Sequence, residues 1–235
     1  MKMAEKTAAR HFIQQSFPHC NVAFLGGSAA SGELTEHSDL DVVILDETQS
    51  SSFRQCFCCF QWKIEAFVYN RTSLSFAFEM SRIEGIPSIL RMCAEGIILK
   101  DDGSALEIQD KAKECIRNGP FEWVEEKQEH MRFMITDLLD DLNSCTDDKE
   151  KIFVAIKLFD LVSEFVLRAD GHWIGQGKWM YRSLFQYDSH LCERYVEGFH
   201  TFMKTGNSEA LSTLTDKVLE RHGGRLFEGY KESFY

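Results

Sequence analysis

Two aspartates separated by one residue, Asp39 and Asp41, follow a glycine-rich turn early in the chain. In an extended strand the side chains at positions i and i+2 lie on one face, with Cα atoms roughly 6.5–7 Å apart. Two carboxylates in this arrangement can bind one Mg²⁺ between them, because this ion prefers oxygen ligands at about 2.0–2.1 Å. The apolar run that follows, residues 42–45, predicts that the rest of this strand is buried.

The turn that precedes these acids, Gly26-Gly27-Ser28, has the composition of an anion-binding site. It follows a short apolar strand predicted at 22–25. Glycine lets the backbone approach a ligand closely, and a short helix opened by the next residues would direct its first N–H groups at an anion. The hydroxyl of Ser28 adds a donor. The turn therefore suits the phosphates of a nucleoside triphosphate.

A third acid, Glu65, lies in an otherwise apolar predicted strand, 61–69. An acidic side chain is costly there unless it is paired, bound to a metal or at an open edge. Two-metal sites hold their ions about 3.5–4 Å apart and bind both the attacking and the leaving oxygen. Glu65 is therefore the best third candidate for a metal site. The alternative is an edge-strand acid that faces water.

In combination, these residues resemble the signature of the polymerase β-like nucleotidyltransferases: Gly-Gly-Ser, a spacer, Asp-x-Asp and a later strand acid. The resemblance is good over residues 22–69 and looser over 89–103, and it points to the small bacterial branch that contains the aminoglycoside nucleotidyltransferases. It implies an α/β (α+β) fold, with a mixed sheet flanked by helices in an N-terminal catalytic domain and a helical bundle as the C-terminal substrate-binding domain. We expect these domains at 1–118 and 119–235, divided at the Asn-Gly-Pro sequence 118–120.

The resemblance also implies roles for the residues of the motif. The nucleoside triphosphate, expected to be ATP, would be bound by Gly26, Gly27, Ser28 and Ser38. Mg²⁺ would be bound by Asp39, Asp41 and Glu65, the last of which could instead help to deprotonate the acceptor. An acceptor oxygen would attack the α-phosphorus in line and release pyrophosphate, with positioning and charge neutralisation supplying most of the catalysis. Many relatives carry Asp at the third position, so Glu65 is a departure from the pattern.

In some aminoglycoside-modifying relatives the general base comes from the helical domain. Four acids remain open for that role here: Glu125, Glu126, Glu129 and Glu164.

A glycine- and aromatic-rich segment, 171–182, is expected to be a loop between helices. Its Trp173 or Trp179 could stack on a base or sugar, while Lys178 and Arg182 could meet phosphate oxygens. The alternative is a structured connection whose aromatic residues pack in the core and whose cations balance nearby acids.

Hydrophobic periodicity predicts the elements around these residues. The first half is expected to contain helices at 4–16, from 73 to a break at 85–87, at 88–95 and at 104–117, with strands at 22–25, 40–45, 53–59, 61–69 and 97–99. The second half is expected to contain four antiparallel helices, at 121–143, 149–169, 190–205 and 208–222.

Composition restricts the partners and the location. The formal net charge is −11 and no basic stripe is present, so nucleic acid is disfavoured and a cationic or neutral small acceptor fits better. No apolar run reaches the roughly 20 residues that span a bilayer, and the N-terminus lacks the apolar core of a signal peptide. We therefore expect a cytoplasmic protein with its 8 cysteines reduced. The cluster Cys56, Cys58 and Cys59 lacks the second ligand pair of a zinc finger.

The sequence thus predicts an enzyme that transfers a nucleoside monophosphate to a hydroxyl of a small acceptor, in the manner of an aminoglycoside nucleotidyltransferase. Two alternatives remain open: transfer of AMP to a protein, as in toxin–antitoxin-like systems, and a non-catalytic nucleotide-binding relative. The acceptor, the base of the nucleotide and the oligomeric state are not determined by the sequence.

Overall fold

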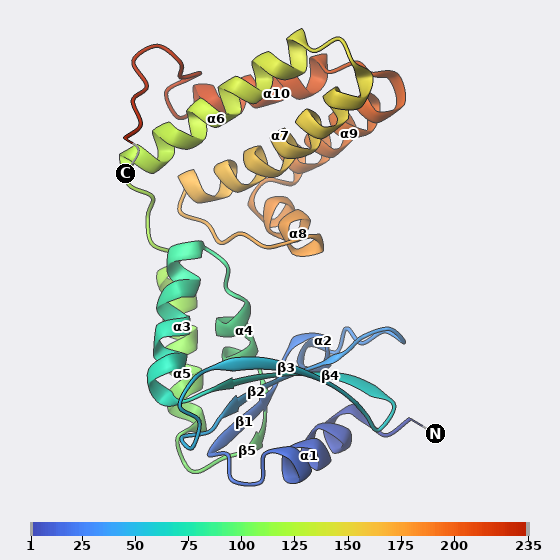
Figure 1. Cartoon of the computed structure of the whole chain (residues 1–235), viewed down its shortest axis with the longest axis vertical. Coiled ribbons are helices and arrows are strands. Elements are labelled where there is room, and N and C mark those ends of the chain that lie inside the picture. The colour runs from blue at the N-terminus through green and yellow to red at the C-terminus, as the bar shows by residue number, and fades with distance from the viewer. Residues whose placement is uncertain (1, 234–235) are drawn as a thin grey trace. The chain divides into compact units, whose positions relative to one another are not determined.

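The computed structural model describes residues 2–233, and the chain divides into two compact units, Met1–Pro120 and Phe121–Tyr235. The described part of the first unit combines helices with a sheet, whereas residues 121–233 contain helices and no strand (Figure 1). The expected α/β (α+β) fold with a helical C-terminal part is therefore confirmed. No helix within residues 2–233 combines the length and the apolar character needed to cross a bilayer.

The first unit is built on a five-stranded mixed sheet with the strand order β3-β4-β2-β1-β5. Its strands are β1 (Val22–Leu25), β2 (Leu40–Leu45), β3 (Phe53–Cys59), β4 (Trp62–Tyr69) and β5 (Ile97–Lys100). Its helices are α1 (Glu5–Ser16), α2 (Gly27–Ser31), α3 (Arg71–Glu84), α4 (Ser88–Ala94) and α5 (Ala105–Asn118). Strands β2 and β4 run parallel, while the other neighbouring pairs are antiparallel.

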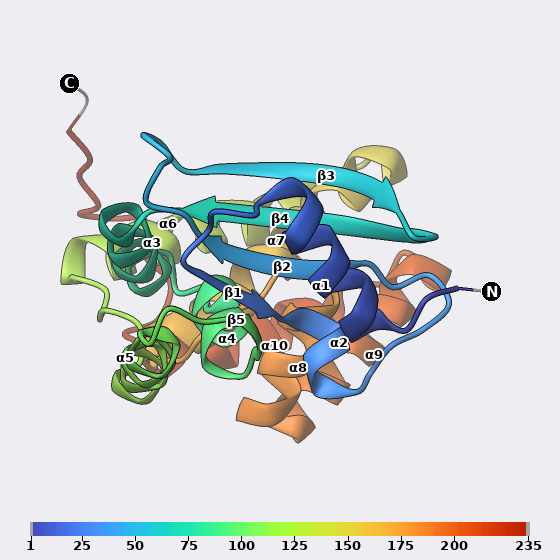
Figure 2. The same ribbon diagram turned by 90° about the horizontal axis from the view of Figure 1, so that it is seen from below.

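One face of the sheet forms the main core of this unit together with α1, which lies across it in Figure 2. Alternate residues of β2 and β4 point to this face because strand side chains alternate with a period of two. Leu40 and Val42 on β2 and Ile64 and Ala66 on β4 are all fully buried there. Phe12 of α1 packs against the same cluster. The opposite face of both strands therefore carries the intervening residues.

A core truncation is expected to test this packing. Ile64→Ala removes apolar atoms from a side chain that is 0% exposed, so the free energy of unfolding should fall by about 2–5 kcal/mol. Leu106→Ala is the matched control, because Leu106 on α5 is 64% exposed and should lose less than about 1 kcal/mol. Urea unfolding followed by circular dichroism measures both changes. Equal losses would show that the Ile64 face is not the core.

The second face of the sheet is covered in part by helices that follow β4. Helix α3 begins with a capping box, in which the Asn70 side chain accepts from the Ser73 N–H and the Ser73 hydroxyl accepts from the Asn70 N–H. Helix α4 contacts β1 and β2 and packs against α5. On this face, the polar side chains of β2 therefore lie at the start of the strand and not at its end.

Asp46 directly follows β2, and its acidic side chain is buried, with only 4% of the residue exposed. Burial alone would raise its pKa, but hydrogen bonds from the Thr48 hydroxyl and N–H and from Gln49 outweigh it and lower the pKa below the ordinary 3.8. Its stabilising contribution should therefore be complete above pH 3.8 and be lost as the pH falls through the lower folded-state pKa. Urea unfolding at pH 6 and pH 3 should show a larger acid-induced loss for the wild type than for Asp46→Asn. Equal losses would contradict this account.

The second unit contains five helices within residues 121–233, so the prediction of four was wrong by one. They are α6 (Glu125–Ser144), α7 (Asp148–Ala169), α8 (Lys178–Tyr187), α9 (Ser189–Thr205) and α10 (Glu209–Glu220). The additional helix, α8, occupies part of the segment 171–182 that was expected to be a loop. It begins directly after Gly177, whose φ of 55° ends the preceding loop. The apolar residues of α8 do recur with helical spacing, although only Leu184 is buried. The helix was missed because the glycines at 171, 175 and 177 favour a loop.

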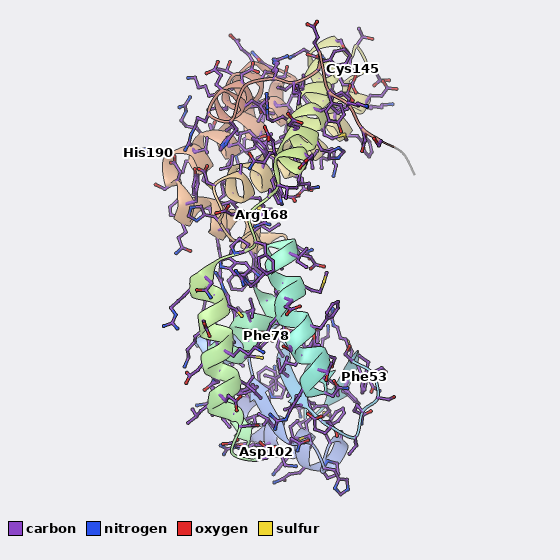
Figure 3. The ribbon with its side chains drawn as sticks, turned by 90° about the vertical axis from the view of Figure 1, so that its left-hand side faces the viewer. Phe53, Phe78, Asp102, Cys145, Arg168 and His190 are labelled. Atoms are coloured by element: carbon purple, nitrogen blue, oxygen red, sulfur yellow. The ribbon has the colours of Figure 1, made fainter. Side chains whose placement is uncertain are left out.

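Helix α6 also begins later than its periodicity predicted, at Glu125 instead of 121. The segment before it is fixed by Arg168 of α7, which is 1% exposed and is labelled in Figure 3. The Arg168 Nη2 donates to the carbonyl of Phe121 at 2.9 Å, and its guanidinium lies 5.3 Å from the ring centroid of Trp123. These contacts hold the segment before α6 against α7, and Val124 is extended, so the helix begins only at Glu125.

Candidate functional site

Asp41 on β2 and Glu65 on β4 are Cα partners across two parallel strands. Their neighbours Leu40 and Ile64 point to the α1 core, so both acidic side chains point to the opposite face. Both acids are half-buried. The structure thus brings together two acids that are separated by 23 residues in the sequence (65 − 41 − 1).

Gly27 lies directly against the Asp41 carboxylate. Its φ is 57°, and a Cβ atom added to it would lie 2.0 Å from Asp41 Oδ2. The N–H of Gly26 donates to the carbonyl of Asp41 at 2.8 Å, which fixes the turn to β2. A Cβ on Gly26 would itself lie 2.9 Å from the Met92 side chain on α4. Both glycines are therefore required by close approach, one against a carboxylate and one against a helix.

Helix α2 starts at Gly27, with Gly26 in an extended conformation before it and no side chain capping its N-terminus. Ser28, half-buried, lies in its first turn. The predicted Gly-Gly-Ser turn therefore leads from β1 into a helical turn next to Asp41, as the sequence suggested.

Asp39 and Ser38 precede β2 and are half-buried. The Ser38 Oγ accepts from the Thr35 N–H at 2.9 Å and lies 3.1 Å from the Thr35 hydroxyl. Ser38 therefore shapes the turn that leads into Asp39, a structural role that was not expected for a residue predicted to bind the nucleotide. Asp39 is two residues before Asp41, but it lies just outside the strand.

Arg54 on β3 forms an ion pair with Glu65 in which the Arg54 Nη2 donates to Glu65 Oε2 at 2.5 Å. This hydrogen bond and the accompanying charge raise the pKa of the Arg54 guanidinium. Within residues 2–233, no three His, Cys, Asp or Glu side chains are close enough together to hold a metal ion. Asp39, Asp41 and Glu65 are thus not gathered around one point, and Glu65 is instead neutralised by Arg54.

Arg54 was missed by the sequence reasoning. The sequence feature that could have pointed to Arg54 is the alternation of side chains along the predicted strand 53–59, which places residue 54 on one face with residues 56 and 58. The cross-strand pairing with β4 that brings Arg54 to Glu65 could not be read from that alternation alone.

Three of the predicted aromatic and cationic residues of the second unit, Lys178, Trp179 and Arg182, lie on α8, whereas Trp173 lies in the loop before it. Trp179 is 43% exposed, with the Arg182 guanidinium 4.6 Å and the Lys178 Nζ 5.8 Å from its ring centroid. Such distances are those of cation–π contacts. Lys178 and Arg182 therefore flank Trp179 in the second unit, whereas the glycine turn and the three acids belong to the first. Trp173 is half-buried.

Of the four acids considered as a general base, Glu164 on α7 has a perturbed environment. Burial raises its pKa, while Lys127 and Arg168 act in the opposite direction and Asp160 adds to the increase. Glu125 and Glu126 are exposed in the first turn of α6, and Glu129 is half-buried on the same helix. A carboxyl with a raised pKa is a better proton acceptor, which favours Glu164 among these four.

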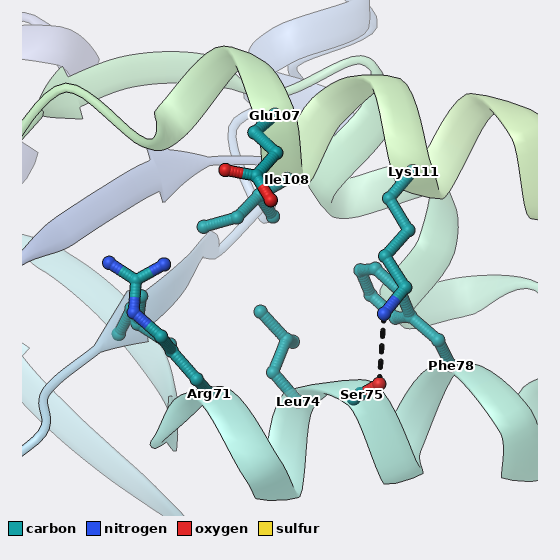
Figure 4. Close-up of a pocket in the computed structure, with 8 residues that line it drawn as sticks. Arg71, Leu74, Ser75, Phe78, Glu107, Ile108 and Lys111 are labelled. Atoms are coloured by element: carbon teal, nitrogen blue, oxygen red, sulfur yellow. Dashed lines mark hydrogen bonds between the residues drawn. The ribbon is translucent and has the colours of Figure 1, made fainter.

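A cavity of about 150 Å³ lies elsewhere in the first unit, between α3 and α5 (Figure 4). Its walls are formed by Leu45, Arg71, Leu74, Ser75, Phe78, Glu107, Ile108 and Lys111. Leu45 is the last residue of β2, whereas Asp41 is near the start of that strand. Leu45 and Asp41 share a face of β2, so the cavity lies beside that face but at the opposite end of the strand from Asp41.

No protein-family model matches the chain, and no curated protein matches it significantly. Among solved structures, the chain is similar to a nucleotidyltransferase-like protein from Exiguobacterium sibiricum. The two share 10% sequence identity with a TM-score of 0.46, over 92% of this chain and 73% of the other. A similarity of this size assigns neither a fold family nor an activity, so the function is argued from the residues of the site.

Proposed function

We propose that this protein is a Mg²⁺-dependent nucleotidyltransferase that moves a nucleoside monophosphate from a nucleoside triphosphate, ATP in the first instance, to a hydroxyl of a small acceptor. The observation that carries the proposal is the position of Asp41. It is in register with Glu65 on a parallel strand, and its carboxylate rests against Gly27 at the start of a helical turn. The glycine turn that we propose to bind phosphate therefore adjoins a pair of acids.

The glycine turn supports triphosphate binding through its backbone. Any side chain at Gly27 would collide with Asp41, so the turn brings main-chain N–H groups close to the acids. These N–H groups and the Ser28 hydroxyl would donate to the phosphate oxygens of the nucleotide. We propose that Gly26, Gly27 and Ser28 bind the β- and γ-phosphates, while Ser38 holds the turn before Asp39.

The chemistry of Asp39 and Asp41 suits a divalent cation whose other ligands would come from the bound triphosphate. Asp39 and Asp41 supply the hard carboxylate oxygens that Mg²⁺ prefers, and the triphosphate would supply others. Glu65 adds a third negative charge beside Asp41, which Arg54 balances when no cation is bound. When bound, Mg²⁺ would neutralise the charge that develops on the transferring phosphoryl group.

The acceptor is proposed to be small and cationic, in the manner of an aminoglycoside. The net charge of −11 favours a cation over nucleic acid. The second unit is proposed to bind the acceptor. Trp179 on α8 is proposed to stack on a base or sugar, while Lys178 and Arg182 beside it would donate to phosphate oxygens of the nucleotide. Glu164 is proposed as the base that takes the proton of the acceptor hydroxyl, because burial raises its pKa.

The test follows a label from the nucleotide. The protein is incubated with Mg²⁺ and ATP labelled either at the α- or at the γ-phosphorus, together with a panel of aminoglycosides and a cell extract. The proposal expects α-label in a small molecule, with all γ-label released as pyrophosphate. Transfer of the γ-label would indicate a kinase, and α-label in a protein would indicate a protein-modifying enzyme. Nucleotide binding without transfer to any acceptor would indicate a non-catalytic relative.

A further inference from the structure

The edge strand β3 exposes two thiols, those of Cys56 and Cys58. Phe57 and Cys59 pack against the core under α1, so the alternating residues Arg54, Cys56 and Cys58 lie on the other face of the sheet. That face also carries Asp41 and Glu65. The two thiols therefore share a surface with the candidate site.

The strand register places Cys56 in line with the two acids. Cys56 is the Cα partner of Glu65, which is in turn the Cα partner of Asp41, so the three form one row across β3, β4 and β2. The Arg54 guanidinium, which binds Glu65, also interacts with the Cys56 side chain. Cys58 is the Cα partner of Lys63, whose side chain is exposed.

The charges around the thiols favour an anionic reagent. Arg54 and Lys63 are the positive charges next to the two thiols, and Glu65, the negative charge next to Cys56, is paired with Arg54. Asp41 adds a second negative charge on this face, one strand farther from Cys56 than Glu65. Cys145 in the second unit offers the opposite case, because its Sγ lies 3.5 Å from Glu150 Oε2. Cys145 is therefore a control, within the same protein, for the effect of charge on the reactivity of Cys56 and Cys58.

We propose that Cys56 and Cys58 form a thiol site for an anionic low-molecular-weight disulfide, and that an adduct on Cys56 blocks the candidate site. In this exchange the Cys56 sulfur, as thiolate, forms a bond to one sulfur of the reagent while the S–S bond of the reagent breaks. The other half leaves as a thiolate, which takes up the proton that the cysteine released. No net oxidation of the mixture occurs, because one disulfide replaces another.

The mixed disulfide would persist until an external thiol attacks it. Side chains at i and i+2 of a strand are parallel, so the Cβ atoms of Cys56 and Cys58 are separated by roughly 6.5–7 Å, whereas a disulfide needs about 3.5–4.5 Å. Cys58 therefore cannot displace the adduct by forming a bond to Cys56 within the intact strand. An adduct on Cys56 would block the candidate site because Cys56, Glu65 and Asp41 lie in one row. Only this blocking effect rests on the proposed function.

The labelling test compares two disulfides of opposite charge on the intact protein at low salt. Oxidised glutathione is the anionic reagent and cystamine the cationic one, and peptide mapping by mass spectrometry gives the rate at each cysteine. Oxidised glutathione should label Cys56 and Cys58 ahead of Cys145, and cystamine should reverse that order. Lys63→Gln should slow labelling by oxidised glutathione about threefold, the factor for one unit charge about 7 Å away in water. Equal anion preference at Cys145, or no effect of Lys63→Gln, would overturn the assignment.

The activity test uses the same adduct. Glutathionylated protein should lose at least about 90% of its α-label transfer and regain it with dithiothreitol, whereas Cys56→Ser should stay active under the same treatment. Full transfer by protein that is quantitatively modified at Cys56 would overturn the block. If the unmodified protein transfers no label but Cys56 still shows the anion preference, the proposed function fails and the thiol site stands.

Discussion

Asp41→Asn is expected to lower the rate of nucleotidyl transfer by about 10³-fold, which corresponds to about 4 kcal/mol of lost transition-state stabilisation. The substitution keeps the size of the side chain, so the contact with Gly27 and the buried strand β2 should survive. What is lost is the negative charge that would bind Mg²⁺ beside the phosphates. Single-turnover transfer of α-label at saturating ATP measures the change, and circular dichroism checks the fold.

Asp110→Asn is the matched control for this prediction. The Asp110 side chain on α5 is 76% exposed and pairs with Lys113 in the same helix, so its loss should leave transfer within about twofold. Raised Mg²⁺ should recover part of the activity of Asp41→Asn if the carboxylate binds the cation. Wild-type rates in Asp41→Asn would remove this residue from the mechanism.

Gly27→Ala is expected to damage both stability and transfer. The alanine would have to adopt a φ of 57°, and its Cβ would lie 2.0 Å from Asp41 Oδ2, so the carboxylate must move. The left-handed conformation costs about 1–2 kcal/mol and the displaced contact adds about as much, giving a loss of about 3 kcal/mol in unfolding free energy. Transfer should fall at least about 10²-fold, since a displacement of about 1 Å at a catalytic group has that effect.

Gly32→Ala separates the two causes. Gly32 ends α2 with a φ of 76°, but a Cβ added there meets no atom within 4 Å. This variant should lose only about 1 kcal/mol of stability and keep its transfer rate. Urea unfolding and single-turnover transfer of both variants give the comparison. Equal losses of transfer in the two would show that the approach of Gly27 to Asp41 plays no part in the site.

Much of the first unit could be predicted from the sequence because its signals are local. The apolar runs at 22–25 and 40–45 are strands β1 and β2 in the structure, and the Gly-Gly-Ser turn between them opens α2. Burial drives each run into the sheet whatever its neighbours are. The hairpin between β3 and β4 was harder, since its turn residues Phe60 and Gln61 both have positive φ without being glycine or asparagine.

Helix α8 shows where local signals fail. A helix of ten residues is only marginally stable by itself in water, so tertiary contacts decide whether it forms. Its contacts with α7 and α9 supply that stabilisation. The glycines before it favoured a loop, and they are indeed in a loop, but that loop ends at Gly177.

By itself, the sequence determined which residues could do chemistry, because an Asp-x-Asp spacing and a glycine turn express their geometry within a few bonds of the backbone. The tertiary structure alone decided the neighbours of those residues: Glu65 opposite Asp41, Arg54 on Glu65, and Cys56 at the end of the same row. A period of two fixes the face of a strand but not its partner or its register. Those are set by the burial of a shared face, which joins strands far apart in the chain.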